Sequence, residues 1–195
     1  MEINFQELKD KNLPIIVLSS LRVGSTWLAK TIADNINYEY FHEVCKNVRQ
    51  QRELYSFSIL HKNYVLKEHT HLFLQRYPES FIKQPAYRIR LLRRDIFRQV
   101  ISYYVAFVRD KYMYHNVHRD IYFGEEIKLE KDILLHKFEE IKRYNNSSLS
   151  FPHPIDLELF YEDLQLPQGD IIPTTLPKNN DEFVAWAWDI LKDKL

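Results

Sequence analysis

A short buried strand followed by a tight loop and a helix constrains the fold of this chain more than any other feature. Residues 15–18, Ile-Ile-Val-Leu, form an apolar run rich in β-branched side chains, typical of a strand buried on both faces. Over residues 25–37, Leu28, Ile32 and Ile36 recur every four residues, which places them on one face of a helix. The start of the chain is therefore predicted to be a strand, loop and helix unit.

The rest of the chain repeats this alternation of apolar runs and helical patterns. We predict further strands at residues 38–41, 64–66, 88–92 and 155–160, helices at 44–60, from 95 onward, over 125–144 and at 181–195, and a polar linker at 145–154. Such alternation predicts a mainly parallel sheet with helices on both faces. We expect one three-layer α/β domain over residues 1–195, with ligands beyond the carboxyl ends of its strands.

Composition and charge exclude several classes of protein. The 27 basic and 27 acidic residues cancel, so no general attraction to nucleic acid or to an anionic membrane is expected. The single cysteine, Cys45, excludes an internal disulfide. Residues 1–12 lack the pattern of a signal peptide, and no stretch reaches the roughly 18 apolar residues of a membrane span. We therefore expect a cytoplasmic protein.

The loop between the first strand and its helix has the composition of a phosphate site. Backbone N–H groups at the start of a helix hold anions, and Gly24, one of three glycines in the chain, leaves room for one. A nucleoside-triphosphate loop would carry Lys in place of Ser25, which disfavours kinase or ATPase chemistry. The simpler alternative is a plain turn capped by Ser25 or Thr26.

Arginines gather around the fourth predicted strand. The cluster consists of Arg88, Arg90, Arg93, Arg94 and Arg98. Arg94 closes the strand, and Ser102 would lie about two turns into the following helix. A guanidinium fork and a hydroxyl at this separation suit a phosphate. For Arg88, Arg90 and Arg98, a solvated basic face is the alternative.

Together these motifs resemble the family of sulfotransferases that use 3′-phosphoadenosine-5′-phosphosulfate (PAPS). Residues 22–27, Arg-Val-Gly-Ser-Thr-Trp, are similar to the family's 5′-phosphosulfate loop, with Arg22 where Lys is commoner. Residues 94–104 resemble its 3′-phosphate signature, with Ile96 where Pro is usual. Residues 67–69, Lys-Glu-His, and 161–164, Tyr-Glu-Asp-Leu, are weaker likenesses. The late Arg-Lys-Gly element of many eukaryotic members is missing, so the chain looks closer to the short bacterial or carbohydrate-directed branches.

The resemblance implies a role for each matched residue. Arg22 and the backbone N–H groups of the loop would hold the 5′-phosphate and stabilise charge on the leaving oxygen. Trp27 would stack on the adenine, with core packing as the alternative. Arg94 and Ser102 would hold the 3′-phosphate, so PAPS is the expected donor and adenosine 3′,5′-bisphosphate the expected product. The predicted donor-binding residues are Arg22, Val23, Gly24, Ser25, Thr26, Trp27, Arg94 and Ser102.

The acceptor must lose a proton during transfer, and the two candidate bases are Glu43 and His69. Residues 41–43, Phe-His-Glu, resemble the second-strand carboxylate of bacterial members, whereas His69 follows Lys67, which would steady the bridging oxygen. The short architecture favours Glu43. In-line sulfuryl transfer depends on positioning and charge stabilisation. We predict no metal, because His69 and His71 lack a third ligand nearby in sequence.

Two other functions stay open at this point. A nucleotide kinase built on the same plan would need ATP and magnesium. A nucleic-acid binding module would stack bases on Tyr87, Tyr103 and Tyr104, although zero net charge weighs against it. The expected acceptor is a hydroxyl or amine of a small molecule or carbohydrate whose identity the sequence leaves open, as it does the oligomeric state. The aromatic stretch at residues 112–123 is a candidate to contact the acceptor.

Overall fold

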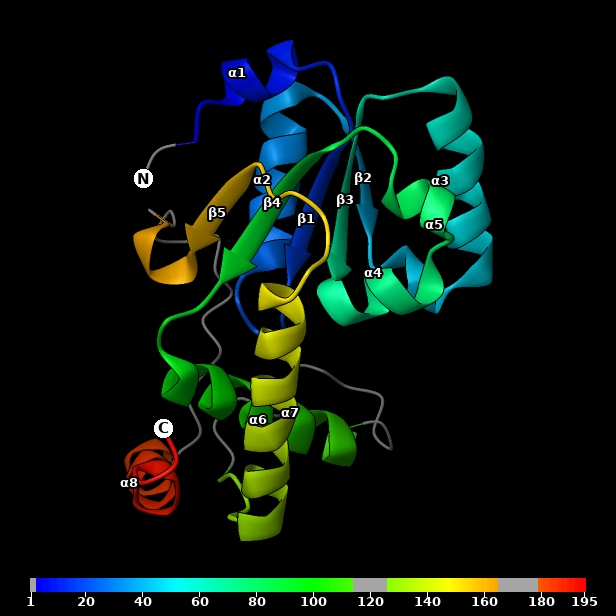
Figure 1. The fold of residues 1–195 in the computed structure, drawn as a ribbon. Coiled ribbons are helices and arrows are strands. Elements are labelled where there is room, and N and C mark those ends of the chain that lie inside the picture. Colours follow the sequence, from blue (N-terminus) through cyan, green and yellow to red (C-terminus); the bar gives the residue numbers. More distant parts are fainter. Residues whose placement is uncertain (1–2, 114–125, 165–178) are drawn as a thin grey trace. The chain divides into compact units, whose positions relative to one another are not determined.

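The computed structural model describes residues 3–113, 126–164 and 179–195, with only the backbone for 109–113 (Figure 1). The chain divides into two compact units, one formed by Met1–Arg94 and Arg143–Leu164, the other by Asp95–Lys142 and Gln165–Leu195. All predicted site residues except Ser102 belong to the first unit.

A five-stranded parallel sheet forms the centre of the first unit, in the order β2-β3-β1-β4-β5. The strands are β1 (Ile15–Ser19), β2 (Glu39–His42), β3 (Tyr64–His69), β4 (Tyr87–Leu92) and β5 (Leu157–Phe160). The helices of this unit are α1 (Phe5–Asp10), α2 (Ser25–Ile36), α3 (Val48–Leu60), α4 (Thr70–Arg76) and α5 (Glu79–Ile82). The predicted α/β class with a parallel sheet and flanking helices is confirmed.

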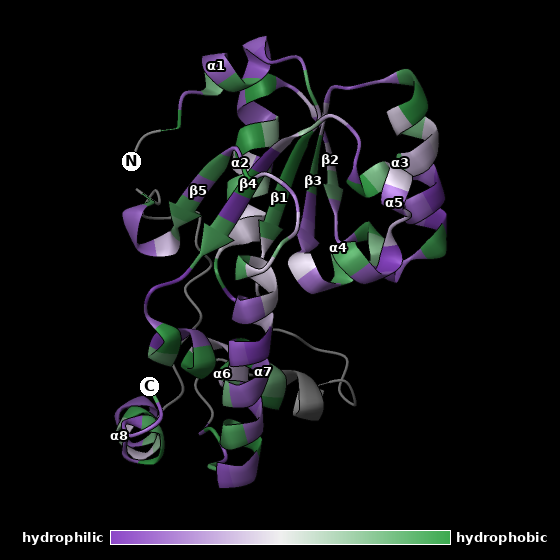
Figure 2. Cartoon of the chain, viewed as in Figure 1, coloured by the Kyte–Doolittle hydropathy of each residue, from purple (hydrophilic) through white to green (hydrophobic). Residues whose placement is uncertain are grey.

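The central strand β1 is buried on both faces, as its apolar run predicts. Ile15 and Val17 pack in one hydrophobic cluster with residues of α2, whereas Ile16 and Leu18 pack in a second cluster with residues of α3, α4 and α5. Figure 2 shows this strand as predominantly hydrophobic. Because side chains alternate along a strand, one short segment joins two cores.

The strand order sets where a ligand site can form. From β1 the chain passes through α2 to the edge strand β2, returns to β3 beside β1, and then crosses to β4 on the other side of β1. In open parallel sheets, ligands bind at the carboxyl ends of strands where the order reverses in this way. The loop after β1 and the ends of β3 and β4 lie at that edge.

The predicted linker at residues 145–154 was partly wrong, because α7 (Lys131–Leu149) continues through its first half. Ser148 is fully buried, and its hydroxyl lies 3.1 Å from Thr70 Oγ1. Arg90 donates to the backbone carbonyls of Ser148 and Leu149, both at 3.2 Å. The bonds from Arg90 satisfy carbonyls that a helix end leaves open, and local composition does not reveal them.

The second unit contains α6 (Ile96–Met113), α8 (Asn180–Leu191) and residues 131–142 of α7. Tyr104 of α6 stacks on Phe183 of α8 with ring centroids 5.3 Å apart, and Phe97 meets Trp188 edge to face at 5.2 Å. The helices predicted from residue 95 and over 181–195 are confirmed. Of the aromatic stretch at residues 112–123, the part from 114 onward lies outside the described residues. No helix that the structure describes is long and apolar enough to cross a membrane.

Candidate functional site

The loop after β1 joins the buried strand to α2 through two residues in the left-handed region. Arg22 has a φ of 58° and Gly24 a φ of 74°. Inside the turn, Ser19 Oγ donates to Ser25 Oγ at 2.8 Å, and both residues are buried. Successive backbone groups in alternating right- and left-handed conformations form concavities that bind anions. Two left-handed residues in one turn are a feature of such concavities, and the role of this loop in binding phosphate stays a prediction.

Gly24 is required by its surroundings as well as by its φ. A Cβ atom at this position would lie 2.9 Å from the ring of Tyr161, which is closer than real carbon contacts allow. The guanidinium of Arg93 lies over the same ring, 4.6 Å from its centroid, and donates to the carbonyl of Arg22 at 3.1 Å. Tyr161 and Arg93 thus hold the loop in place from the ends of β5 and β4.

The remaining loop residues divide between core and surface. Val23 is buried, and Trp27 is a half-buried residue that packs against the hydrophobic cluster beside β1. Arg22 and Thr26 are exposed. The packing of Trp27 matches the core alternative and leaves its contact with adenine a prediction.

A charged cluster forms where β2 and β3 end. Glu43 follows β2 directly, with a φ of 47°, and its backbone N–H donates to the carbonyl of Lys67 at 2.9 Å. Its Oε1 accepts from Lys67 Nζ and lies 2.9 Å from His69 Nε2. Lys67 keeps only 2% of its side chain exposed and His69 8%, against 15% for Glu43. The structure thus brings together three of the four residues that the sequence proposed for catalysis, all except Arg22.

Two residues that the sequence analysis left without a role complete this cluster. Lys46 pairs with Glu43 Oε2 from the short 3₁₀-helix Val44–Lys46. His42 Nε2 lies 3.4 Å from Glu43 Oε1 and 3.2 Å from Thr26 Oγ1 of the loop after β1. The sequence places His42 next to Glu43 and Lys46 three residues after it, but closeness in sequence does not reveal where a side chain points. His42 thereby links the candidate base to the candidate phosphate loop.

The cluster strongly favours the ionised form of Glu43. Burial alone would raise the pKa of Glu43, but contacts from His42, His69, Lys67 and Lys46 outweigh burial and hold that pKa far below its ordinary value of 4.5. Burial lowers the pKa of Lys67, although Glu43 opposes it, and burial likewise lowers the pKa of His69. His69 is therefore neutral near pH 7 and donates from Nε2 to the carboxylate.

Backbone strain coincides with the candidate site. Among the described residues, positive φ angles outside glycine occur at Asn12, Arg22, Asn37 and Glu43. Asn tolerates this region, whereas Arg and Glu rarely enter it. Such conformations cost on the order of 1–3 kcal/mol each and concentrate at functional sites. Arg22 and Glu43 were both proposed from the sequence for catalysis.

Arg94 is held by carboxylates at the end of β4. Its Nη1 and Nη2 donate to the two oxygens of Asp163, each at 2.7 Å, and its backbone N–H donates to Glu162 at 3.1 Å. The Arg94 guanidinium, which the sequence assigned to a 3′-phosphate, is therefore paired with Asp163. Ser102 belongs to the second unit, on α6, so its pairing with Arg94 stays a prediction.

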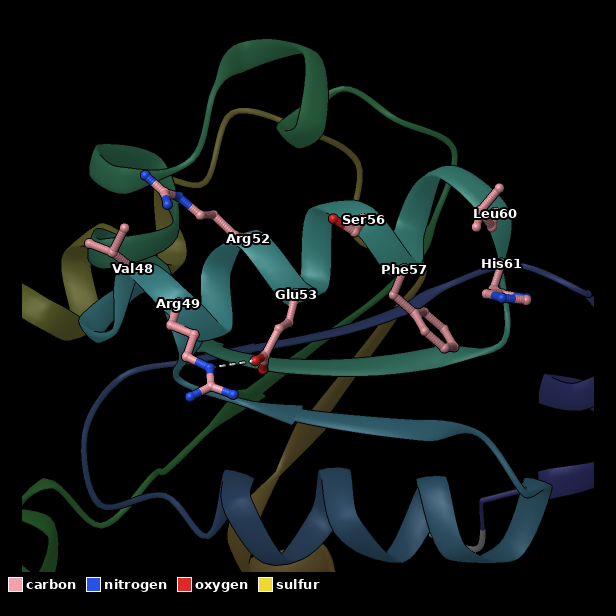
Figure 3. Close-up of a pocket in the computed structure, with 8 residues that line it drawn as sticks. All are labelled: Val48, Arg49, Arg52, Glu53, Ser56, Phe57, Leu60 and His61. Carbon is pink, nitrogen blue, oxygen red and sulfur yellow. Dashed lines mark hydrogen bonds and ion pairs between the residues drawn. The ribbon is translucent and has the colours of Figure 1, made fainter.

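A hollow of about 750 Å³ lies elsewhere, along the outer face of α3 (Figure 3). Its walls are Val48, Arg49, Arg52, Glu53, Ser56, Phe57, Leu60 and His61. Figure 3 shows Arg49 and Glu53 joined on this face, at 3.0 Å. None of the predicted site residues lines it. Within residues 3–113, 126–164 and 179–195, no three His, Cys, Asp or Glu side chains gather as a metal site would require.

Comparison with known proteins assigns no family to the chain. No protein-family model matches it, and no curated protein matches it. Among solved structures it is similar to the crystal structure of shikimate kinase from Bacteroides thetaiotaomicron, with 9% sequence identity and a TM-score of 0.43. That match covers 92% of this chain and 98% of the other. A likeness this distant does not indicate what the chain does.

Proposed function

We propose that this protein transfers a sulfuryl group from PAPS to a hydroxyl or amine of a small-molecule or carbohydrate acceptor. The observation that carries the proposal is the Glu43, Lys67 and His69 cluster, joined through His42 to Thr26 of the loop after β1. A base, a buried cation and an anion-binding loop then meet at one edge of the sheet. The resemblance of residues 22–27 and 94–104 to the sulfotransferase motifs supplies the donor.

The loop after β1 would hold the phosphosulfate end of the donor. The backbone N–H groups at the start of α2, the exposed side chain of Arg22 and the hydroxyl of Thr26 would offer donors to an anion. The absence of a side chain at Gly24 makes room for the ring of Tyr161, which packs against the loop and holds it in place. Arg94 would reach the 3′-phosphate by exchanging Asp163 for it, with Ser102 as the predicted second contact.

The transfer itself is a single displacement at sulfur. The acceptor oxygen or nitrogen forms the new bond to sulfur while the bond from sulfur to the bridging phosphate oxygen breaks. The acceptor proton passes to Glu43, and adenosine 3′,5′-bisphosphate leaves with the bridging electrons. Arg22 and Lys67 stabilise the charge that develops on the leaving oxygen, a type of interaction typically worth about 10²–10³ in rate.

The two oxygens of Glu43 have different surroundings, which supports Oε2 as the atom that would take the proton. Oε1 faces the buried donors Lys67 and His69, which fix the orientation of the carboxylate. Oε2 faces Lys46, whose side chain is 58% exposed and can swing into solvent. An acceptor hydroxyl that displaces Lys46 would meet Oε2, and loss of that cation would raise the basicity of Glu43. His69 then orients the base.

The test is a transfer assay with two donors and one panel of acceptors. The protein is incubated with sulfur-labelled PAPS or with labelled ATP and magnesium, and with hydroxyl and amine acceptors that include sugars. We expect label to move only from PAPS, in the presence of a chelator as well as without it. Phosphoryl transfer from ATP in the same panel would instead establish the kinase alternative.

A further inference from the structure

The edge strand β2 holds the start of α2 through two aromatic residues on one of its faces. Tyr40 and His42 are two positions apart, so their side chains share a face, and their rings stack with centroids 6.1 Å apart. Tyr40 donates from its hydroxyl to the carbonyl of Thr26 at 3.4 Å, and His42 Nε2 lies 3.2 Å from Thr26 Oγ1. Thr26 is therefore fixed from β2 through its backbone and through its side chain.

The neighbouring carboxylate determines which proton His42 carries. Glu43 Oε1 lies 3.4 Å from the same Nε2 atom, and Lys67, Lys46 and His69 favour the ionised form of this carboxylate. A lone pair on Nε2 would face that negative oxygen, so Nε2 bears a hydrogen. Thr26 Oγ1 then serves as an acceptor for this N–H, and its own hydroxyl hydrogen points away from His42.

We propose that His42 is a positioning residue that turns the Thr26 hydroxyl into a donor for the phosphosulfate group, an inference that rests on the proposed function. Thr26 stands at the exposed start of α2, in the loop predicted to hold the 5′-phosphate. A hydroxyl whose oxygen already accepts a hydrogen bond is both oriented and polarised toward an incoming anion. His42 also connects this donor to the carboxylate that takes the acceptor proton.

Three substitutions at His42 separate this role from simple packing. Gln can place an N–H near the position of Nε2, Asn places one near Nδ1 instead, and Ala supplies none. Calorimetry should show adenosine 3′,5′-bisphosphate binding to His42→Gln within about 2-fold of the unchanged protein. Binding to His42→Asn and His42→Ala should weaken about 5- to 10-fold, the size of one net hydrogen bond. His61→Ala, an exposed histidine that lines the hollow on α3, is the matched control and should bind normally.

A double-mutant cycle between His42 and Thr26 tests whether His42 acts through Thr26. Thr26→Val removes the hydroxyl and keeps the branched shape, so adding His42→Ala to it should weaken nucleotide binding no further. Circular dichroism and thermal unfolding confirm that each variant folds. If the unchanged protein binds the nucleotide but Gln fails to rescue, or the two losses add, His42 has no such role. If the unchanged protein does not bind the nucleotide at all, the proposed function fails and this inference fails with it.

Discussion

The ends of β2 and β3 and the end of β4 carry charged groups that are organised in contrasting ways. Glu43 and its partners Lys67 and His69 are largely buried and contact one another directly. Arg94 is 51% exposed and Asp163 37% exposed, and they are paired with each other. Electrostatic interactions strengthen as water is excluded, whereas exposed ion pairs contribute little. The first region is therefore suited to chemistry, and the second to reversible exchange of partners on binding.

Removal of the proposed base Glu43 should reduce turnover more than any other substitution. A smaller effect would contradict the assignment of chemistry to the buried region. Glu43→Gln keeps the shape of the side chain but cannot take up the acceptor proton, so turnover from PAPS should fall about 10²- to 10⁴-fold. Nucleotide affinity, measured by calorimetry, should change little. His69→Asn should cost less turnover because His69 orients the base. Near-normal turnover in Glu43→Gln, with collapse in His69→Asn, would reverse the two roles.

Arg22→Ala should cause the second-largest loss of turnover, and it should reduce turnover more than nucleotide affinity. Arg22 is proposed to stabilise the negative charge that develops on the leaving oxygen in the transition state. Turnover should therefore fall about 10²-fold, while product-nucleotide affinity falls less. Turnover and calorimetric affinity are compared on the same preparation. An unchanged turnover would remove Arg22 from the mechanism.

The buried cluster should also make the stability of the fold depend on pH. The pKa of Glu43 is held far below 4.5 in the folded state, so below about pH 4.5 the unfolded chain binds a proton that the folded chain does not. The stabilisation from Glu43 is complete above that pH and falls as the solution is acidified, by about tenfold in the unfolding constant per pH unit. Urea unfolding should therefore show the gap between the unchanged protein and Glu43→Gln narrowing below pH 4.5. A gap that stays constant from pH 7 to pH 3 would contradict this electrostatic description.

The smallest effect is expected at the exposed region, where Asp163 competes with the 3′-phosphate for Arg94. Asp163→Asn weakens that competition, so adenosine 3′,5′-bisphosphate should bind about 2- to 5-fold more tightly, in line with the modest energy of an exposed ion pair. The affinity for 5′-AMP should not change, because it lacks the 3′-phosphate. Weaker binding of adenosine 3′,5′-bisphosphate, with 5′-AMP unchanged, would show that Asp163 orients Arg94 rather than competing for it.

The sequence predicts the buried region better than the exposed one, for a physical reason. The apolar run at β1 and the periodicity of α2 determine a parallel sheet, and a parallel sheet places the residues after β2 and β3 at one edge. Proximity of Glu43 to Lys67 and His69 follows from that topology. The pairing of Arg94 with Asp163 joins residues 69 positions apart by side-chain rotamers, which no periodicity encodes. The link from His42 to Thr26 was missed for the same reason.

Errors in the predicted elements have a similar origin. The Asn-Asn-Ser-Ser segment has the composition of a loop, yet it completes α7 because Arg90 and Thr70 supply tertiary partners for its end. The short helices α1, α4 and α5 were not predicted, since segments of 4 to 7 residues carry little periodic signal. Intrinsic helix propensity is a weak guide wherever tertiary contacts determine where a helix ends.

The central claim, that this site binds the nucleotide of a sulfuryl donor, is tested most directly by calorimetry with four nucleotides. Adenosine 3′,5′-bisphosphate should bind without magnesium and more tightly than 5′-AMP, ADP or ATP. Arg94→Ala should bring its affinity toward that of 5′-AMP, because a charge-assisted contact of about 1.5–3 kcal/mol is lost, less the cost of releasing Asp163. Equal affinities for adenosine 3′,5′-bisphosphate and 5′-AMP, or tighter magnesium-dependent binding of ATP, would contradict the account.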